Sequence, residues 1–277
     1  METTMTRRHL YPRANPAQEP SPWWYFGRAV YVSRYDYRKI FLIFLVVGVP
    51  LGAIGVLFKL PIFLYAAFAL AVVGLAMLAY SLIGLYRQYG HYSVQYFRRL
   101  LDLASAEGPL TVADLHIGTY RHSYRLAQLL PEATIYSIDC WNVEGPPPEK
   151  AIRDVRDLEP PPTSNPHIRP LRAEGFGVPL PDSSCDLVVF GFGTHEVPVG
   201  GPREKLFKES QRILKPNGKA LLFEHGYDTH NYLIFGPVIK HVTKRQDWLD
   251  TMKDYFDDVR YARTSHAVDL FVGTRHA

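Results

Sequence analysis

The chain has 277 residues and a net charge of +4, and 47% of its residues are hydrophobic. This length allows one large domain or two small ones. The positive balance is no argument for nucleic-acid binding, because the basic residues beside two apolar runs are explained by membrane topology and anionic lipid headgroups. Cys140 and Cys185 have no CxxC spacing, so we expect reduced, buried thiols rather than a zinc site.

The N-terminal segment, residues 1–39, changes character along its length. Residues 1–22 are rich in Pro, Arg and polar residues, a composition that predicts disorder. The following residues are dense in aromatic rings, which prefer the membrane interface. These rings belong to Trp23, Trp24, Tyr25, Phe26, Tyr31, Tyr35 and Tyr37. We therefore expect residues 1–39 to be disordered at first and then to lie on a membrane surface.

Two long apolar runs follow, and only Lys59 interrupts them. No charge occurs from Ile40 to Phe58 or from Leu60 to Tyr86. About twenty apolar residues suffice for a helix to cross the hydrocarbon core, so residues 40–86 are predicted to form a transmembrane helical hairpin. A cleaved secretory signal is not expected, because the apolar runs start too far from the N-terminus. The alternative is a helical pair buried in a soluble core.

The flanks of the hairpin predict its orientation. The turn of the hairpin contains only one basic residue, Lys59. The basic residues that flank the hairpin are Arg28, Arg34, Arg38, Lys39, Arg87, Arg98 and Arg99. Positive residues stay cytoplasmic, so we expect an integral membrane protein with two spans and both termini in the cytoplasm. Gly48 and Gly52 have the GxxxG spacing of closely packed helices or of a homo-oligomer, whereas Pro50 between them is equally consistent with a simple kink.

Residues 87–108 predict an amphipathic linker helix, and residues 109–277 a domain in which strands alternate with helices. Strands are predicted at 111–117, 134–140, 168–173, 185–192, 219–225, 259–263 and 267–274, and helices at 120–130, 203–214 and 244–255. Short, almost continuous apolar strands between helices predict an α/β fold with a doubly wound, mostly parallel sheet. The last two strands predict a closing hairpin in which the last strand is antiparallel.

Ligands of such sheets bind beyond the carboxyl ends of the strands. This rule selects the polar residues that follow the first, second, fourth and fifth strands. They are Asp114, His116, Gly118, Thr119, Asp139, Gly193, Thr194, His195, Glu196, Glu224, His225, Asp228, His230 and Asn231.

Four segments of the domain resemble, in the same order, the motifs of class I S-adenosylmethionine-dependent methyltransferases of the type 11 kind. They read VADLHIGTY, IYSIDCW, VPLPDSSCDLVVFGFGTHEV and ESQRILKPNGKALLFEH. The last two are the most specific, because a helix, a Lys-Pro-x-Gly turn and a strand occur together in context. The resemblance does not extend to the hairpin.

The resemblance implies a Rossmann-like fold with S-adenosylmethionine as the cofactor. Asp139 would accept hydrogen bonds from the ribose hydroxyls, since a carboxylate suits a diol. Asp114 would orient the loop, and Gly118 would let the backbone approach the cofactor closely. Other residues implied near the cofactor are His116, Thr119, Glu174, Gly193 and Thr194. From the residues alone, Asp114 and Asp139 could also be helix caps.

His116 and Tyr120 stand where two motif glycines are expected. A dinucleotide pyrophosphate needs those glycines, so an NAD(P)-dependent oxidoreductase is not expected. S-adenosylmethionine has no phosphate, and its loop tolerates larger residues better. A degenerate domain that no longer binds a cofactor remains an alternative.

Methyl transfer needs positioning, desolvation and, for some acceptors, a base. His195, Glu196 and His225 are the predicted catalytic residues, and Asp228 and His230 are further candidate bases. Alternatively, these histidines are interfacial hydrogen-bonding groups. The alternative is a metal site at which His195, Glu196, His225 and His230 converge. No metal is expected, because these residues lack an HExxH or comparable spacing.

The segment at 231–242, NYLIFGPVIKHV, is unusually apolar for a surface connection. Together with the hairpin it predicts a small lipophilic acceptor delivered from the bilayer, although a helix packed on the sheet would read the same. The sequence thus predicts a membrane-anchored methyltransferase, with membrane lipids as partners and without nucleic acid. The alternative is a catalytically inactive, membrane-anchored binding or scaffold protein.

Overall fold

The computed structural model of the chain describes residues 10–141, 150–173 and 177–276. Seven strands form one sheet in the order β3-β2-β1-β4-β5-β7-β6. Strands β1 to β5 pair in parallel, and β7 is antiparallel to both of its neighbours. The strands are β1 (Thr111–His116), β2 (Thr134–Asp139), β3 (Ile168–Arg172), β4 (Cys185–Gly191), β5 (Leu214–His225), β6 (Asp257–Arg263) and β7 (Val268–Thr274). The predicted doubly wound sheet with an antiparallel last strand is confirmed.

The sheet is covered on both faces, as its apolar strands require. Along β4, Leu187 and Val189 face one apolar cluster while Val188 and Phe190 face the other, because successive side chains of a strand point to opposite faces. Helices α5 (Ser93–Ala104) and α6 (Arg121–Leu129) pack on the first face. Helices α8 (Gly201–Ile213) and α10 (Arg245–Tyr255) pack on the second.

The predicted helices and strands of the domain agree with the structure within one or two residues, except at the start of β5. This strand begins at Leu214, which pairs with Cys185, and regular pairing resumes only at Lys219. Between them the backbone turns through Asn217, whose φ of +65° is left-handed. The Lys-Pro-Asn-Gly turn was expected to separate helix from strand, but it is an irregularity inside β5.

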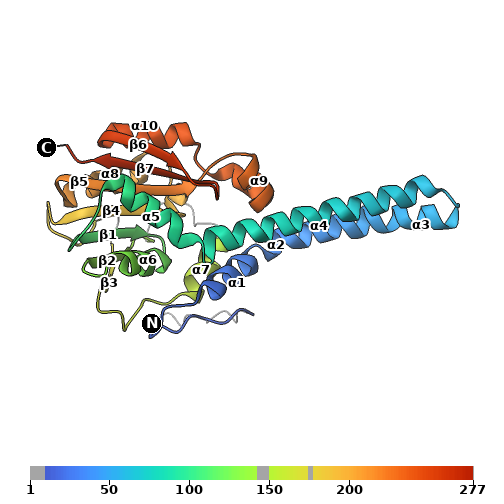
Figure 1. Cartoon of the computed structure of the whole chain (residues 1–277), viewed down its shortest axis with the longest axis horizontal. Helices are drawn as coiled ribbons and strands as arrows, with labels where there is room; N and C mark the ends of the chain where they lie inside the picture. Colours follow the sequence, from blue (N-terminus) through green and yellow to red (C-terminus); the bar gives the residue numbers. More distant parts are fainter. Residues whose placement is uncertain (1–9, 142–149, 174–176, 277) are drawn as a thin grey trace.

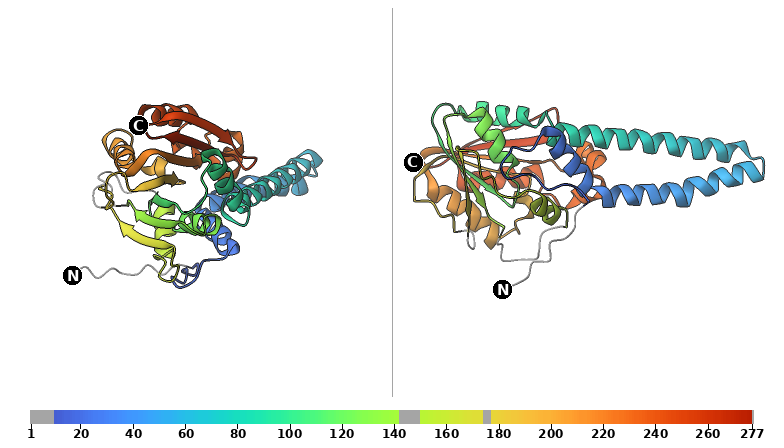
Figure 2. Two further views of the ribbon diagram at one scale, coloured as in Figure 1. Left: turned by 60° about the vertical axis from the view of Figure 1, so that its left-hand side comes forward. Right: turned by 90° about the horizontal axis from the view of Figure 1, so that it is seen from below.

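Two helical rods project from the domain and run side by side (Figure 1; Figure 2, right). The first consists of α2 (Arg34–Ile43), the π-helical turn η1 (Phe44–Gly48) and α3 (Val49–Leu57), and the second is α4 (Pro61–Tyr89). The π turn ends two residues before Pro50, which cannot donate a backbone hydrogen bond and so interrupts the regular helical pattern.

Gly48 and Gly52 both face the second rod. A Cβ atom on Gly52 would lie 4.0 Å from the Ala67 Cβ, and one on Gly48 would lie 3.6 Å from a Leu70 methyl carbon. The GxxxG spacing therefore serves helix packing within the chain.

The rods expose their apolar side chains. The most apolar 18-residue stretch of Arg34–Leu57 has a mean hydropathy of 2.8 and is 6% buried. The corresponding stretch of Pro61–Tyr89 has a mean hydropathy of 2.5 and is 0% buried. Phe41, Val46 and Leu75 are among the exposed side chains. Helices of a soluble core are buried, so a core role does not explain this surface.

The base of the hairpin is joined to α9 (Thr229–Phe235), the helix that follows β5. The Ser81 hydroxyl donates to the Ile234 carbonyl over 2.5 Å, and the Gln88 amide donates to the Asn231 side chain over 3.0 Å. Gly84 lies against Ile234, where a Cβ atom would come within 2.4 Å of the Ile234 Cγ1. The start of the apolar stretch after β5 thus packs on the hairpin, while the Phe235 ring also contacts the His225 ring at the end of β5.

The N-terminal segment also lies against the domain. Helix α1 (Pro22–Val32) contacts α7 (Lys150–Leu158), and the Ala14 N–H donates to the Leu158 carbonyl over 2.8 Å. The aromatic residues of this segment are not all on one surface. Trp23 is 65% exposed, whereas Tyr25 is fully buried against the domain.

Candidate active site

Two cavities lie beyond the carboxyl ends of the strands. The first has a volume of 550 Å³ and follows β1, β2 and β3; its lining includes Gly118, Tyr120, Asp139, Arg156 and Arg172. This is the edge of the sheet at which the sequence predicted ligand binding. The first cavity therefore contains two of the predicted cofactor residues, Gly118 and Asp139.

The His116 side chain is turned into the domain. Its Nδ1 accepts the Gly118 N–H over 3.0 Å, so the ring proton is on Nε2, which donates to the Ser137 hydroxyl over 3.0 Å. The Ser137 and Ser123 hydroxyls share a hydrogen bond of 2.5 Å, and the Ser123 hydroxyl also lies 2.5 Å from the Asp114 carboxylate, which accepts its proton. Burial lowers the pKa of His116, which is consistent with this neutral form. The imidazole thus fixes the loop and leaves the cavity open.

Gly118 and Tyr120 shape the floor of the first cavity. Gly118 has φ = +106°, a conformation that favours glycine, and a Cβ there would lie 2.8 Å from the Arg156 Cγ. Tyr120 is buried, and its ring meets the His116 ring edge-on at 4.7 Å between centroids. The ring lines the cavity without filling it.

Arg156 of α7 holds the carboxylate of Asp139 with two hydrogen bonds. Its Nη1 donates to Oδ1 over 2.6 Å, and its Nη2 donates to Oδ2. The Trp141 N–H also donates to Oδ1, over 3.0 Å. Burial alone would raise the pKa of Asp139, but the Arg156 guanidinium outweighs it and lowers that pKa. The predicted ribose acceptor is therefore bonded to an arginine in this structure.

A buried ion pair between Arg28 and Glu159 separates the two cavities. Their side chains are only 3% and 1% exposed. Tyr25 and Thr119 donate to the same carboxylate over 3.1 and 2.9 Å. Glu159 lines the first cavity and Arg28 lines the second, so α1 contributes part of the wall between them.

The second cavity has a volume of 160 Å³ and lies beyond β4 and β5, beside the base of the hairpin. Its histidines and its one glutamate come from three elements, η2 (Thr194–Glu196), the end of β5, and η3 (Gly236–His241). The rest of the lining is largely apolar and includes Ala29, Leu85, Phe192, Phe235, Ile239 and Val242. An apolar pocket with a few convergent polar groups is the usual form of a small-molecule site.

Glu224, at the end of β5, organises the loop after β4. Its fully buried carboxylate accepts the Gly193 and His195 N–H groups over 3.3 and 3.2 Å and contacts His195 Nδ1 at 2.8 Å. Burial would lower the pKa of His195, but Glu224 and Glu196 outweigh it and raise that pKa to about 10. The sequence had placed Glu224 only at the ligand edge, without this role.

His225 is buried in the same cavity. Its ring stacks on Phe192 with centroids 4.0 Å apart, and its Nε2 lies 3.0 Å from the Tyr89 hydroxyl. Its Nδ1 is buried without a hydrogen-bond partner among the described residues. Burial lowers the pKa of His225 to about 3, so the ring is neutral at physiological pH.

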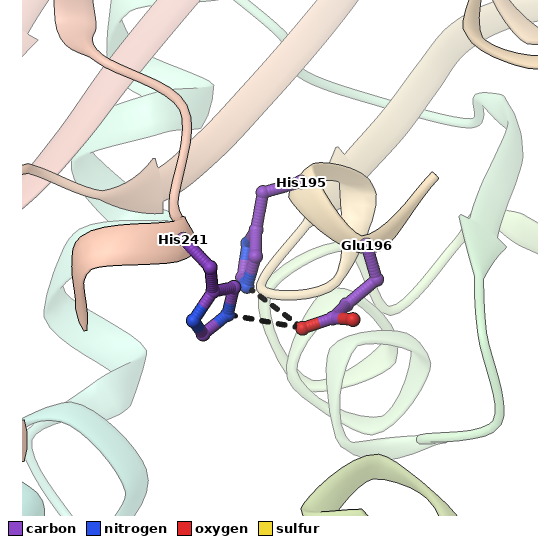
Figure 3. A group of neighbouring side chains, drawn as sticks. All are labelled: His195, Glu196 and His241. Atoms are coloured by element: carbon purple, nitrogen blue, oxygen red, sulfur yellow. Dashed lines mark hydrogen bonds and ion pairs between the residues drawn. The ribbon is translucent and has the colours of Figure 1, made fainter. Parts of the chain in front are cut away.

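The structure brings together a different set of histidines from the one that the sequence suggested. One ligand atom each from His195, Glu196 and His241 lies within 4.8 Å of the other two, and Figure 3 shows both rings beside the carboxylate. His230 is bonded instead to the Tyr80 hydroxyl over 2.6 Å. His241 was missed, because its position at the end of an apolar stretch gave no signal of a site.

The remaining predicted residues have structural roles or lie outside the described part. Asp228 caps α9 by accepting the Asn231 N–H over 3.1 Å, and it also pairs with Arg263 at 2.6 Å. Gly193 packs on Ile117, and Thr194 is buried in η2. Glu174 lies outside the described residues. Cys140 and Cys185 are free and buried, as predicted.

Comparison with known proteins identifies the central part of the domain. Residues 114–222 match the sequence model of the family described as "Methyltransferase domain". The demethylmenaquinone methyltransferase of Thermus thermophilus is 30% identical over 131 residues, which are 46% of this chain and 52% of that protein. The chain thus spans about half the length of the curated relative that it matches.

Solved structures with a similar chain path include methyltransferases of low sequence identity. An S-adenosylmethionine-dependent methyltransferase from Aquifex aeolicus has a TM-score of 0.48 and 17% identity, over 64% of this chain and 88% of that one. Human N-acetylserotonin methyltransferase, in complex with S-adenosylmethionine, has a TM-score of 0.49 and 16% identity, over 73% and 55%. The family match over residues 114–222 supports a class I methyltransferase domain that uses S-adenosylmethionine.

Proposed function

We propose that the protein is a membrane-anchored S-adenosylmethionine-dependent methyltransferase that acts on a small lipophilic acceptor. The observation that carries the proposal is the pair of cavities at one edge of the sheet. One cavity contains the loop and the acid that suit the cofactor. The other is apolar and lies beside the base of an exposed apolar hairpin.

The residues of the first cavity fit the cofactor. Gly118 has the left-handed backbone that permits close approach, and Asp139 presents a carboxylate to a cavity of 550 Å³. S-adenosylmethionine supplies a methyl group on a positively charged sulfur. In this proposal Asp139 accepts the ribose hydroxyls, so Arg156 must release at least one carboxylate oxygen on binding. Asp114, His116 and Thr119 hold the loop in shape, and Gly193 and Thr194 lie near the methyl group.

The acceptor in this proposal is a quinone-type ring or another lipophilic molecule with a weakly acidic nucleophile. The name of the curated relative, a demethylmenaquinone methyltransferase, supports this class. The apolar lining of the second cavity is suited to such a ring. His225 Nδ1, which has no hydrogen-bond partner in the described part of the chain, is the proton acceptor in this proposal. His195 and Glu196 would position the acceptor.

The membrane proposal rests on the exposed apolar surface of both rods. We propose that residues 40–86 span the bilayer twice and that both termini and the domain at 109–277 face the cytoplasm, because basic residues flank the spans. The exposed aromatic side chains of the N-terminal segment, such as that of Trp23, would then lie at the membrane surface. Membrane lipids are partners in this arrangement, and the acceptor reaches the second cavity from the bilayer. The GxxxG spacing also allowed a homo-oligomer formed through the hairpin, but both of its glycines already face α4.

A second candidate is a catalytically inactive scaffold with a methyltransferase fold. The observation that favours it is that Arg156 already bonds Asp139 in the first cavity, while the Arg28–Glu159 ion pair forms one wall of that cavity. The two candidates differ in whether the first cavity admits a cofactor.

Methyl transfer itself tests the proposal. The full chain, purified in nanodiscs, is incubated with S-adenosylmethionine carrying a labelled methyl group and with a demethylmenaquinone of short side chain that is kept in its reduced, hydroquinone form. The proposal expects label in the organic extract, and it expects loss of that label in the Asp139→Ala variant. Binding of S-adenosylhomocysteine without methyl transfer to this quinone would support the proposed cofactor site and would show that the acceptor is a different molecule. Neither binding nor transfer would favour the scaffold.

A further inference from the structure

The cluster of His195, Glu196 and His241 is built from two separate turns of the chain. His195 and Glu196 are in η2 after β4, and His241 ends η3 after β5. The Nε2 atoms of both histidines face the same carboxylate oxygen, Glu196 Oε1, at 3.5 Å for His195 and 3.1 Å for His241. Figure 3 shows the two contacts meeting at that oxygen.

The other ring nitrogen of each histidine already contacts a hydrogen-bond acceptor. His195 Nδ1 lies 2.8 Å from the Glu224 carboxylate, and His241 Nδ1 lies beside the Val238 carbonyl. A neutral imidazole that donates from Nδ1 presents a lone pair at Nε2. With both rings in this form, two lone pairs and a carboxylate oxygen converge on one point, where either a proton on a ring or a metal ion can lie between them.

The charges of the cluster also call for a cation. Glu196 and Glu224 bring two carboxylates, and Glu224 is fully buried. Arg203 of α8 supplies one positive charge nearby, where it donates to the His195 and Val197 carbonyls over 3.2 and 2.9 Å. The two carboxylates that contact His195 favour a positive charge at this point of the cavity.

We propose that His195, Glu196 and His241 form a binding site for a divalent first-row transition metal, with Zn²⁺ as the metal that two imidazoles and one carboxylate suit best. Zinc ligands at about 2.0–2.2 Å in tetrahedral geometry lie about 3.4 Å apart. Ligand atoms within 4.8 Å of one another therefore need only a small contraction. Metal-bound histidines usually donate their other nitrogen to a carboxylate or a backbone carbonyl, which is the arrangement of Glu224 and Val238 here.

Three protein ligands leave one tetrahedral position open, as in zinc sites that bind a further ligand. All three residues line the 160 Å³ cavity, so the open position faces the space proposed for the acceptor. An oxygen-containing ligand in that cavity could complete the coordination. The metal site itself does not depend on the proposed methyl transfer, and its test uses no activity.

Metal content of the purified full chain gives the first test. Tag-free protein is prepared in detergent without chelators, and zinc and iron are measured by elemental analysis. Co²⁺ is then titrated into metal-depleted protein, and its visible d–d absorption is followed. The variants are Glu196→Gln and His241→Gln. The matched control is His167→Gln, because His167 directly precedes β3 and so lies at the amino ends of the strands, away from the cluster. Circular dichroism of each protein confirms folding.

The proposal expects about one metal ion per chain and an intense tetrahedral Co²⁺ spectrum that Zn²⁺ abolishes. Glu196→Gln and His241→Gln should weaken Co²⁺ binding by more than tenfold, and Glu224→Gln by about tenfold to a hundredfold through loss of ring orientation. His167→Gln should bind as the parent does. Protein without metal that gives no Co²⁺ spectrum would overturn the proposal and leave a proton as the balancing charge. A spectrum unchanged by the Glu196 and His241 variants would also overturn it, since the metal would then be bound elsewhere.

Discussion

Arg156 donates from both terminal nitrogens to the carboxylate of Asp139, with 2.6 Å between Nη1 and Oδ1. Asp139 is the acid that the family resemblance assigns to the ribose of the cofactor, and Arg156 reaches it from α7. The cofactor and the arginine therefore compete for the same oxygens, which leads to the first prediction.

Arg156→Ala should strengthen binding of S-adenosylhomocysteine. Charge-assisted hydrogen bonds contribute about 1.5–3 kcal/mol each, so removal of the competing arginine should lower the dissociation constant about tenfold or more. Calorimetric titration measures the change. Arg153→Ala on the same helix is the matched control, and it should bind as the parent does. Weaker binding by Arg156→Ala would mean that the arginine holds the cofactor instead of competing with it.

Arg28→Met should destabilise the domain. The substitution leaves the Glu159 carboxylate, 1% exposed, without its counter-charge, at a cost of about 3–5 kcal/mol. Because a hydrophobic pair can replace a buried ion pair, Arg28→Met/Glu159→Met should recover most of the loss. Thermal unfolding of the detergent-solubilised protein checks both variants. Equal melting temperatures of the parent and the single variant would show that α1 is not docked as described.

Gly84→Val should loosen the joint between α4 and α9. A Cβ atom at Gly84 would come within 2.4 Å of Ile234, and such overpacking costs about 1–3 kcal/mol. Limited proteolysis between hairpin and domain should become faster, and adding Ile234→Ala should slow it again. Gly52→Ala is the matched control, since its Cβ would lie 4.0 Å from Ala67. Equal proteolysis rates for the Gly84 and Gly52 variants would contradict this packing.

Cys140 and Cys185 should not react with maleimide in the folded protein. Both are buried, and burial raises the pKa of each thiol, which suppresses the reactive thiolate. Mass spectrometry should find no adduct under native conditions and two adducts after denaturation. Rapid native labelling of Cys140, which follows directly on Asp139, would indicate that the cleft opens widely without a ligand.

The sheet could be predicted from the sequence because its strands carry a local signal. Segments such as LVVFGF and ALLFE are short, apolar and separated by helices, and this pattern is characteristic of a parallel sheet buried on both faces. The edge that carries the candidate site follows from that order. The start of β5 could not be predicted, because Lys-Pro-Asn-Gly reads as a turn and its pairing with β4 depends on contacts distant in sequence.

The partners of the site residues were not predictable, because they come from elements with other apparent roles. Arg28 was counted with the basic residues that flank a membrane span, yet it is buried beside Glu159. His241 is 45 positions after Glu196 and ends an apolar stretch, and only the return of η3 to the sheet brings it to the cluster. The glycine-to-histidine change at His116 was visible, but the serines that turn its ring inward were not.

Calorimetric titration of the full chain with S-adenosylhomocysteine, alongside Asp139→Asn and Arg156→Ala, shows directly whether the first cavity binds the cofactor. We expect saturable binding of one equivalent to the parent, at least tenfold weaker binding to Asp139→Asn, and tighter binding to Arg156→Ala. Absence of binding by both the parent and Arg156→Ala would contradict this expectation, because the cleft beside Gly118 and Asp139 would then not be a cofactor site.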